Sequence, residues 1–266
     1  MGRTPSSNTV LRLYLIRHSE TEANLAGVVL GQSDSPVTER GMEQARALGR
    51  TNFIRETRFQ RYYTSDIHRA VQTTHLVLEA ASRGDPMIRL EPRLREMAKG
   101  AREGQPKSVS DEEALLWRRR QNKDVELPLR ETEDEAWNRI HAFLQDLLED
   151  YASQSTTSGE PSDGRSSQST DPCCIFVMSH SAILRIFLRR LIGDEHLYQH
   201  PSARFDATGH LYIPNTSVTI LDVRGRDEQE PPHNSASTPH TFHVDIIQLT
   251  CADHLGETNS QAAYAE

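Results

Sequence analysis

The sequence predicts a three-layer α/β/α domain around a six-stranded, mostly parallel sheet. Short apolar segments alternate with segments of helical periodicity along most of the 266 residues, a pattern typical of parallel strands joined by helices. Two strand-like segments, 216–223 and 242–249, follow without a helix between them. The chain is long enough for one such domain, but its mean hydropathy of −0.64 indicates additional polar segments.

The six predicted strands differ in how strongly the sequence marks them. "CCIFVM" is a continuous apolar run, which favours a strand buried on both faces of the sheet. "LRLYLI" is mostly apolar, and the last two strands have β-branched or alternating residues. The predicted strands are 11–16, 61–65, 86–90, 173–178, 216–223 and 242–249.

The helices between these strands are predicted from apolar periodicity and from capping residues. Thr38 is the expected N-cap of the first helix and Asp66 that of the second. Two further helices begin with capping boxes, in which a Ser or Thr is followed three residues later by Glu: Ser110 with Glu113, and Thr132 with Glu135. The predicted helices are 38–54, 67–81, 112–120, 135–151 and 181–193.

One domain, residues 10–254, accounts for all of these elements, with short tails at 1–9 and 255–266. Two polar segments interrupt it, at 153–172 and 224–240. Because neither contains apolar residues to bury, we expect both to be disordered loops within the domain.

Composition excludes several functions. The net charge of −8 and the pI near 5.8 provide no overall attraction for nucleic acid or an acidic membrane surface. No apolar run could span a membrane, and the three cysteines form no disulfide framework. We therefore expect a cytoplasmic or nuclear protein. The histidines show no metal-ligand spacing, so neither a metal nor a cofactor is expected. The sequence does not identify a protein partner.

Ionisable residues follow four of the predicted strands. Arg17 and His18 come directly after the first strand, and His180 follows "IFVMS". Arg69 lies in the first turn of the helix after the second strand, and Glu96 follows the third strand. Since the carboxyl ends of parallel strands meet at one edge of a sheet, we expect these side chains to converge there.

This combination of side chains is suited to phosphoryl transfer. Guanidinium groups bind phosphate oxygens through paired, charge-assisted hydrogen bonds. A neutral imidazole can attack phosphorus, and a carboxylic acid can protonate the oxygen that leaves. The histidines, arginines and carboxylate therefore predict a catalytic site for a phosphate ester.

Motifs containing these residues resemble those of the histidine phosphatase superfamily, which has the phosphoglycerate mutase-like fold. The resemblance covers residues 11–223 and keeps the family's order along the chain. The motifs are "RHSETEAN", "GQSDSPVTERGMEQA", "SDIHRAVQT", "LREMAKGAREG", "VMSHSAILR" and "PNTSVTIL".

The resemblance implies a role for each candidate residue. His18 would be the nucleophile that becomes phosphohistidine, and Glu96 the proton donor to the leaving group. Arg17, Arg69 and His180 would form the phosphate pocket. Substrate contacts are also implied for Thr21, Asn24, Gly31 and Ser181.

Two serines depart from the family pattern, because Ser19 and Ser181 replace the glycine that follows each catalytic histidine. Their side chains would either crowd the phosphate or bind it. We nevertheless expect an active, metal-independent phosphatase for a sugar phosphate or similar small phosphomonoester. The alternatives are a phosphoglycerate mutase-type isomerase and a catalytically silent phosphate-binding regulator.

The expected substrate class depends on two segments. Only about ten residues separate "LLWRRR" from the next predicted helix, too few for the insertion with which cofactor-dependent mutases bind a second acidic group. The segment "DIIQLTCADHLGET" is similar to fructose-bisphosphatase-like members of the TIGAR type. Both observations favour a phosphatase, with Arg118 and Arg119 facing solvent.

Overall fold

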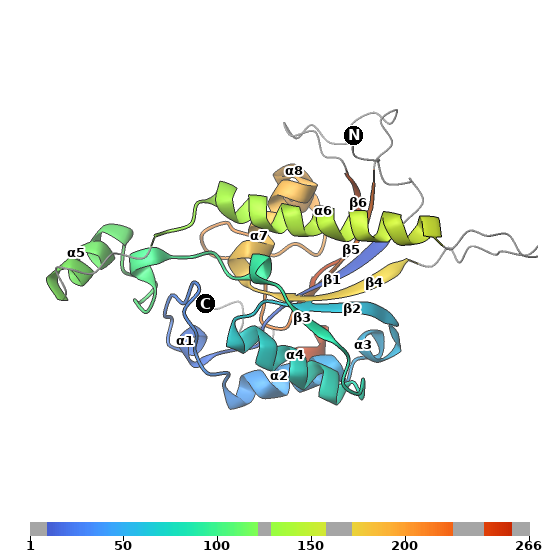
Figure 1. Ribbon diagram of the computed structural model, residues 1–266. Coiled ribbons are helices and arrows are strands. Elements are labelled where there is room, and N and C mark those ends of the chain that lie inside the picture. The colour runs from blue at the N-terminus through green and yellow to red at the C-terminus, as the bar shows by residue number, and fades with distance from the viewer. Residues whose placement is uncertain (1–9, 122–128, 158–171, 226–241, 257–266) are drawn as a thin grey trace, which may run out of the picture.

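A computed structural model of the protein describes residues 10–121, 129–157, 172–225 and 242–256. One sheet runs through the molecule and helices cover both of its faces, which is the predicted three-layer architecture (Figure 1). The predicted tail 1–9 and most of the two predicted inserts and of the tail 255–266 lie outside the described residues.

The sheet has six strands in the order β3-β2-β4-β1-β5-β6. The pairs β3–β2, β2–β4 and β4–β1 are parallel, whereas β5 is antiparallel to both β1 and β6. The predicted mostly parallel sheet is therefore confirmed. The strands are β1 (Leu11–Arg17), β2 (Phe59–Thr64), β3 (Ile88–Leu90), β4 (Cys173–Ser179), β5 (Val218–Gly225) and β6 (Phe242–Cys251).

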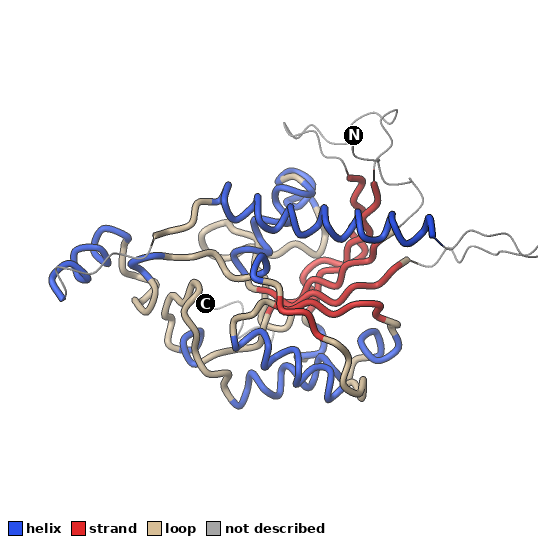
Figure 2. The backbone as a smooth tube through the Cα atoms, viewed as in Figure 1, coloured by secondary structure: helices blue, strands red, loops and turns tan. Residues whose placement is uncertain are grey.

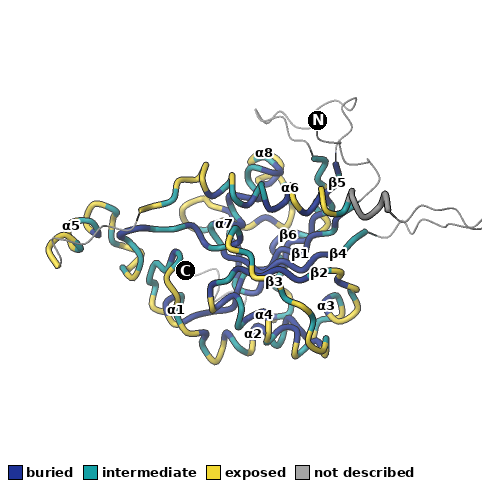
Figure 3. Tube along the Cα trace, viewed as in Figure 1, coloured by how far each residue is buried: buried dark blue, intermediate teal, exposed yellow. Residues whose placement is uncertain are grey.

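Alternation along β1 supplies both faces of the core. Leu13 and Leu15 pack with residues of α6 (Glu133–Thr157) and α7 (Ser181–Ile192), whereas Tyr14 and Ile16 pack with residues of α2 (Glu39–Gly49) and α4 (His68–Ala80). Figure 2 shows these two helical layers on opposite sides of the strands. The central strands are the most buried part of the chain (Figure 3).

The predicted helix 38–54 is two helices, α2 and α3 (Asn52–Glu56). Thr38 is the N-cap of α2, as predicted, and its Oγ1 accepts from the amide of Gly41 at 2.9 Å. The break occurs at Thr51, which has extended backbone and donates its hydroxyl to the carbonyl of Leu48 at 2.6 Å. That hydroxyl satisfies a carbonyl at the end of α2, so the chain can turn there.

The prediction that Asp66 caps the second helix is wrong. The N-cap of α4 is Ile67, which provides no side-chain hydrogen bond. The Asp66 carboxylate instead accepts two hydrogen bonds from the Arg95 guanidinium, at 2.7 and 2.5 Å. A paired contact with a guanidinium is stronger than a single bond to an amide, and Arg95 precedes Glu96 in the segment after β3.

Both predicted capping boxes are present, before α5 (Asp111–Gln121) and before α6. α6 continues to Thr157, so residues 153–157 of the first predicted insert are helical rather than disordered. These residues are Gln, Ser and Thr without Gly or Pro, and Gly159 comes only after the helix ends. β5 likewise includes the first two residues of the second insert, 224–225.

Short helices complete the described chain. Within the described residues, every helix is too short or too polar to span a lipid bilayer. The short helices are α1 (Glu22–Leu25), α8 (Asp194–Gln199), η1 (Pro92–Leu94), η2 (Gly100–Arg102) and η3 (Asp253–Leu255).

Candidate active site

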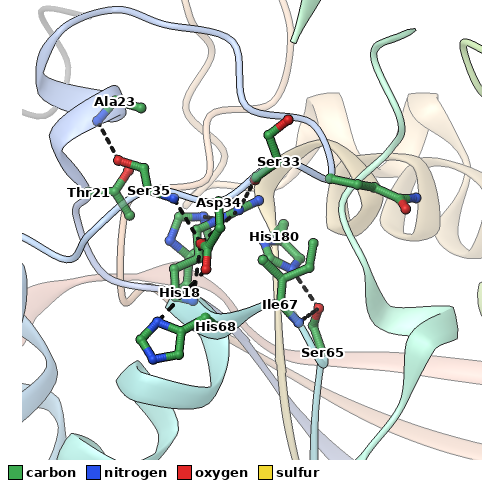
Figure 4. A network of polar contacts seen from close by, with 12 residues as sticks. His18, Thr21, Ala23, Ser33, Asp34, Ser35, Ser65, Ile67, His68 and His180 are labelled. Carbon is green, nitrogen blue, oxygen red and sulfur yellow. Dashed lines mark hydrogen bonds and ion pairs between the residues drawn. The ribbon is translucent and has the colours of Figure 1, made fainter. Parts of the chain in front are cut away.

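The two candidate histidines meet because of the register between β1 and β4. Arg17 is paired with Ser179 at the ends of these parallel strands, so His18 and His180 are the next residues on neighbouring strands. Neighbouring strands lie about 4.8 Å apart. The ring centroids of His18 and His180 are 5.0 Å apart, within reach of one phosphoryl group (Figure 4).

A backbone hydrogen bond fixes the tautomer of His18. Its Nδ1–H donates to the carbonyl of Ser19 at 2.7 Å, which leaves the lone pair on Nε2. Arg69 Nε donates to this Nε2 at 3.3 Å. His18 therefore has a nucleophilic nitrogen directed toward a cation, where an anionic phosphoryl group would bind.

Arg69 is held from behind by the loop before α2. Its side chain is only 1% exposed, and Nη1 and Nη2 donate to the carbonyls of Ser33 and Gly31 at 2.7 and 2.9 Å. Asp34 Oδ1 lies 3.5 Å from Nη1 and neutralises part of the charge. Burial lowers the pKa of Arg69, while Glu96 and Asp34 oppose that shift.

Gly31 requires its glycine for two reasons. Its φ is +55°, in the left-handed region, and a Cβ there would lie 2.2 Å from Glu103 Oε1. Glu103 binds the Gly31 loop through the amides of Gln32 and Ser33 and also accepts from the amide of Lys99 at 2.9 Å. The carboxylate thus joins the loop behind Arg69 to the segment after Glu96.

Burial and neighbouring cations keep both histidines neutral. Desolvation lowers the pKa of His18 well below its ordinary value, with further lowering by Arg69 and Arg17. The pKa of His180 is also far below its ordinary value, because of burial and then because of Arg69, His18 and Arg17. An uncharged His18 retains the Nε2 lone pair that a nucleophile needs.

Arg17 approaches the same region from the end of β1. Its side chain is half-buried, and Nη1 donates to the carbonyl of Ile213 at 2.7 Å. Arg17 is close enough to lower the pKa of both histidines. The two guanidinium groups therefore place positive charge around the paired rings.

Ser65 positions His180. It follows β2, and its Oγ lies 2.9 Å from His180 Nε2 (Figure 4). The other ring nitrogen, Nδ1, is buried and has no hydrogen-bond partner among the described residues. A buried polar atom without a partner is costly, and a phosphate oxygen or hydroxyl is a suitable partner for it.

Glu96 lies at the amino end of α7, directly beyond His180. Its carboxylate accepts from the amides of Ala182 and Ile183, both at 3.0 Å, and from the amide of Met97 at 2.7 Å. The residue is 8% exposed. These bonds hold the carboxylate beside the histidine pair, and its charge also acts on Arg69.

Thr21 and Asn24 form a capping box on α1. Thr21 is buried, its Oγ1 accepts from the Asn24 amide at 3.3 Å, and the Asn24 side chain accepts from the Thr21 amide at 3.2 Å. Asn215 donates from Nδ2 to the carbonyl of His18 at 3.0 Å and to Asn24 Oδ1 at 3.4 Å. The polar groups of Thr21 and Asn24 thus contact the loop that holds His18.

The two serines that replace glycines make different contacts. Thr73 Oγ1 donates to the carbonyl of Arg69 at 2.7 Å, so its single proton is used. Ser19 Oγ, 2.9 Å away, must therefore donate to Thr73 Oγ1. Ser19 is fully buried in this bond, whereas Ser181 is half-buried with Oγ 3.5 Å from Glu96 Oε2.

Several contributing residues were missed by sequence reasoning. Ser65 and Thr73 lie inside the motif "SDIHRAVQT", yet only its arginine was selected. Arg139, on α6, donates to the carbonyls of Arg95 and Glu96 at 2.7 and 3.3 Å, and an arginine on a helix gave no signal of that contact.

The expectation that Arg118 faces solvent is wrong. Arg118 donates from Nε and Nη2 to the carbonyls of Ala101 and Glu103, at 2.8 and 2.7 Å. Because those carbonyls belong to the segment after Glu96, Arg118 braces that segment. Arg119 is exposed, as expected.

The types of side chain at the candidate site indicate which reactions it can support. Among the described residues, no three His, Cys, Asp or Glu side chains are grouped as metal ligands would be. What the described site assembles is a neutral, nucleophilic imidazole, a second imidazole, two guanidinium groups and a carboxylate at the carboxyl edge of a parallel sheet. These groups are the ones expected in the class of phosphoryl-transfer proteins that use a histidine nucleophile.

Comparisons with known proteins agree with this class. Residues 13–231 match the histidine phosphatase superfamily (branch 1). The probable phosphoglycerate mutase GpmB of Yersinia pestis (strain Pestoides F) is 35% identical over 143 residues, which are 53% of this chain and 64% of that relative. The chain therefore matches less than two thirds of that relative's length.

Solved structures show the same fold. Phosphoglycerate mutase from Bacillus anthracis str. Sterne superposes with a TM-score of 0.61 and 19% identity, covering 95% of this chain and 98% of that one. Alpha-ribazole phosphatase from Shigella flexneri gives 0.58 and 22%, covering 91% and 97%. Mycobacterial glucosyl-3-phosphoglycerate phosphatase gives 0.58 and 19%, covering 90% and 98%.

This chain belongs to the histidine phosphatase superfamily, branch 1. The superfamily and the phosphoglycerate mutase-like fold predicted from the sequence are confirmed. Its relatives and structural neighbours include both mutases and phosphatases, and the TIGAR-type similarity stays a prediction.

Proposed function

We propose that the protein hydrolyses a small phosphomonoester, a sugar phosphate or similar compound, through phosphohistidine on His18. The observation that carries this proposal is the 5.0 Å separation of the His18 and His180 rings between two arginines. One tetrahedral anion can contact all four side chains at that spacing. No metal ion is required in this proposal, because Arg17 and Arg69 supply the positive charge.

In the first step, Nε2 of His18 attacks phosphorus. The N–P bond forms as the bond from phosphorus to the ester oxygen breaks, and Glu96 gives a proton to that oxygen. Arg17, Arg69 and His180 stabilise the equatorial oxygens. The His18 tautomer supports this step, because Nδ1–H is already bound to the Ser19 carbonyl.

In the second step, water replaces the leaving group. Glu96, now ionised, takes a proton from the water as its oxygen bonds to phosphorus and the N–P bond breaks. Phosphate is released, and both His18 and Glu96 return to their starting protonation states. Glu96 can serve both steps because its backbone contacts hold it beside the histidine pair.

Mutase activity is the second candidate, because phosphoglycerate mutases are among the similar proteins. A mutase would return the phosphoryl group to a second hydroxyl and would require a bisphosphate to prime His18. Labelled substrate separates the two activities. A phosphatase releases the label as free phosphate, whereas a mutase keeps it on an isomerised product.

The contacts of Ser19 weigh against the silent-regulator alternative. Its hydroxyl is used by Thr73 on α4, the helix that carries Arg69. A hydroxyl bound in this way is not available to crowd the phosphate. The Ser19 hydroxyl is therefore directed to Thr73 rather than to His18 Nε2.

The test uses purified protein with a panel of sugar phosphates, phosphoglycerates, phosphoamino acids and nucleotides. We expect EDTA-insensitive phosphate release and acid-labile phosphate on the wild-type protein. His18→Ala should lose at least about 10³-fold in kcat/KM, as loss of a nucleophile does in other enzymes.

His75→Ala is the matched control, since His75 is an exposed histidine on α4. It should retain wild-type activity. Full activity in His18→Ala, or absence of acid-labile phosphate during turnover of a good substrate, would overturn the mechanism.

A further inference from the structure

A cavity of about 390 Å³ lies beside Glu96, on its α7 side. Met97 and Ala182 are among its lining residues; Met97 follows Glu96, and the Ala182 amide binds the Glu96 carboxylate. The charged side chains around it are Lys99, Arg130, Arg185 and Arg189, together with Glu131 and Glu133. Cations therefore outnumber carboxylates here, although the whole chain has a net charge of −8.

Lys99 lacks an anionic partner in this cavity. Its Nζ contacts the thioether sulfur of Met97 at 3.4 Å, a weak acceptor, and among the described residues it forms no ion pair with a carboxylate. Burial lowers the pKa of Lys99; Glu96 opposes the shift, and Arg130, Arg185 and Arg102 add to it. A partly buried ammonium beside other cations is a favourable site for an anion.

Arg185 is the second cation of the cavity that could bind an added anion. Its Nε donates to the carbonyl of Leu211 at 3.0 Å, and Nη2 is 4.0 Å from Asp206 Oδ2, the limit of an ion pair. By contrast, Arg189 is paired with Asp194 at 2.8 Å, and Arg130 is paired with Asp111. Lys99 and Arg185 are thus the cations with the weakest existing partners.

The Glu96 carboxylate lies between the cavity and the proposed phosphate-binding residues. The charge of Glu96 acts on Arg69 at the histidine pair and also on Lys99 and Arg185 in the cavity. In the proposed reaction Glu96 protonates the leaving oxygen. The remainder of the leaving group must therefore lie next to Glu96, whose neighbours Met97 and Ala182 line this cavity.

We propose that this cavity binds a second anionic group of the substrate, a carboxylate or a second phosphoryl group carried by the leaving group, through Lys99 and Arg185. This inference rests on the proposed phosphatase function. It narrows the expected substrates to compounds that carry a second anionic group besides the phosphoryl group that is removed; these compounds are called doubly anionic below. The inference does not depend on the "LLWRRR" segment, because Arg118 is bound to backbone carbonyls.

Two matched pairs of compounds test the inference. 3-Phosphoglycerate and glycerol 3-phosphate differ in a carboxylate, whereas fructose 1,6-bisphosphate and fructose 6-phosphate differ in a second phosphoryl group. Titration calorimetry with the His18→Ala protein measures binding without turnover. We expect the doubly anionic member of at least one pair to bind about 10- to 100-fold more tightly, the range of a charge-assisted contact.

Lys99→Met, added to His18→Ala, should remove this preference while leaving the affinity for the singly anionic member within about threefold. Lys107→Met is the matched control, because Lys107 is exposed, and it should keep the preference. In an otherwise wild-type protein, Lys99→Met should lower kcat/KM for the preferred substrate by a similar factor. The pair that shows the preference identifies the anionic group.

Equal affinities within both pairs, or a preference that survives Lys99→Met, would overturn the inference. Failure of the proposed function has a different result: the binding preference persists and depends on Lys99, while wild-type protein releases no phosphate from any of the four compounds. Circular dichroism and the affinity for the singly anionic compounds report whether the Lys99→Met protein is folded.

Discussion

His254 on η3 should contribute to the dependence of stability on pH, and His254→Gln should remove that contribution. Thr216 donates its hydroxyl to the carbonyl of Asn215 at 2.7 Å, so His254 Nε2–H must donate to Thr216 Oγ1, at 2.9 Å. His254 Nδ1 is buried without a hydrogen-bond partner among the described residues. A proton added to Nδ1 would therefore remain unsatisfied.

The magnitude follows from the pKa of this imidazole. Burial lowers the pKa of His254 from 6.5 to about 4. Below pH 6.5 the unfolded chain binds a proton that the folded protein does not, so stability is lost as pH falls from 6.5 toward 4. Between pH 7.5 and pH 5.0 this one group should lower the free energy of unfolding by about 2 kcal/mol.

Urea unfolding followed by tryptophan fluorescence at pH 7.5 and pH 5.0 measures the effect. The loss between the two pH values should be about 2 kcal/mol smaller in His254→Gln than in the wild type. His75→Gln replaces an exposed histidine and should preserve the wild-type loss. If the His254→Gln and wild-type proteins lose the same free energy, within about 0.5 kcal/mol, the reasoning about Nδ1 is wrong.

Two further predictions concern the active site. Because the pKa of His18 is far below its ordinary value, kcat/KM corrected for substrate ionisation should change less than twofold from pH 7.5 to 6.0. A histidine of pKa 6.5 would lose about fourfold, and that loss would contradict the burial argument. A double-mutant cycle of Ser19→Gly and Thr73→Val, measured by unfolding, should give about 0.5–1.5 kcal/mol of coupling. Additive effects would show that this hydroxyl pair is not stabilising.

Much of the site could be predicted because strand ends are visible in sequence. The apolar runs ending before His18 and His180 predict two buried strands, and parallel strands bring their carboxyl ends to one edge. That the two rings are only 5.0 Å apart could not be predicted, since it depends on β1 and β4 being neighbours in register. Strand order is set by packing of the whole domain.

The contacts that orient the candidate catalytic side chains could not be predicted from the sequence. Asp66 has the position and chemistry of a helix cap, but Arg95 from another segment competes for it. Arg69 depends on carbonyl groups of the Gly31 loop, and every residue type provides a carbonyl. Residue type alone carries no information about such partners, so only the tertiary structure reveals them.

Glu103 joins two segments of the candidate active site, the Gly31 loop behind Arg69 and the segment that contains Lys99. One of its oxygens accepts from the amides of Gln32 and Lys99, and the other accepts from Ser33. A displacement of the Lys99 segment therefore also displaces the loop whose carbonyls hold the Arg69 guanidinium. If the proposed function holds, a substitution that alters binding of the leaving group near Lys99 should also alter binding of the phosphoryl group at Arg69, because Glu103 joins the two segments.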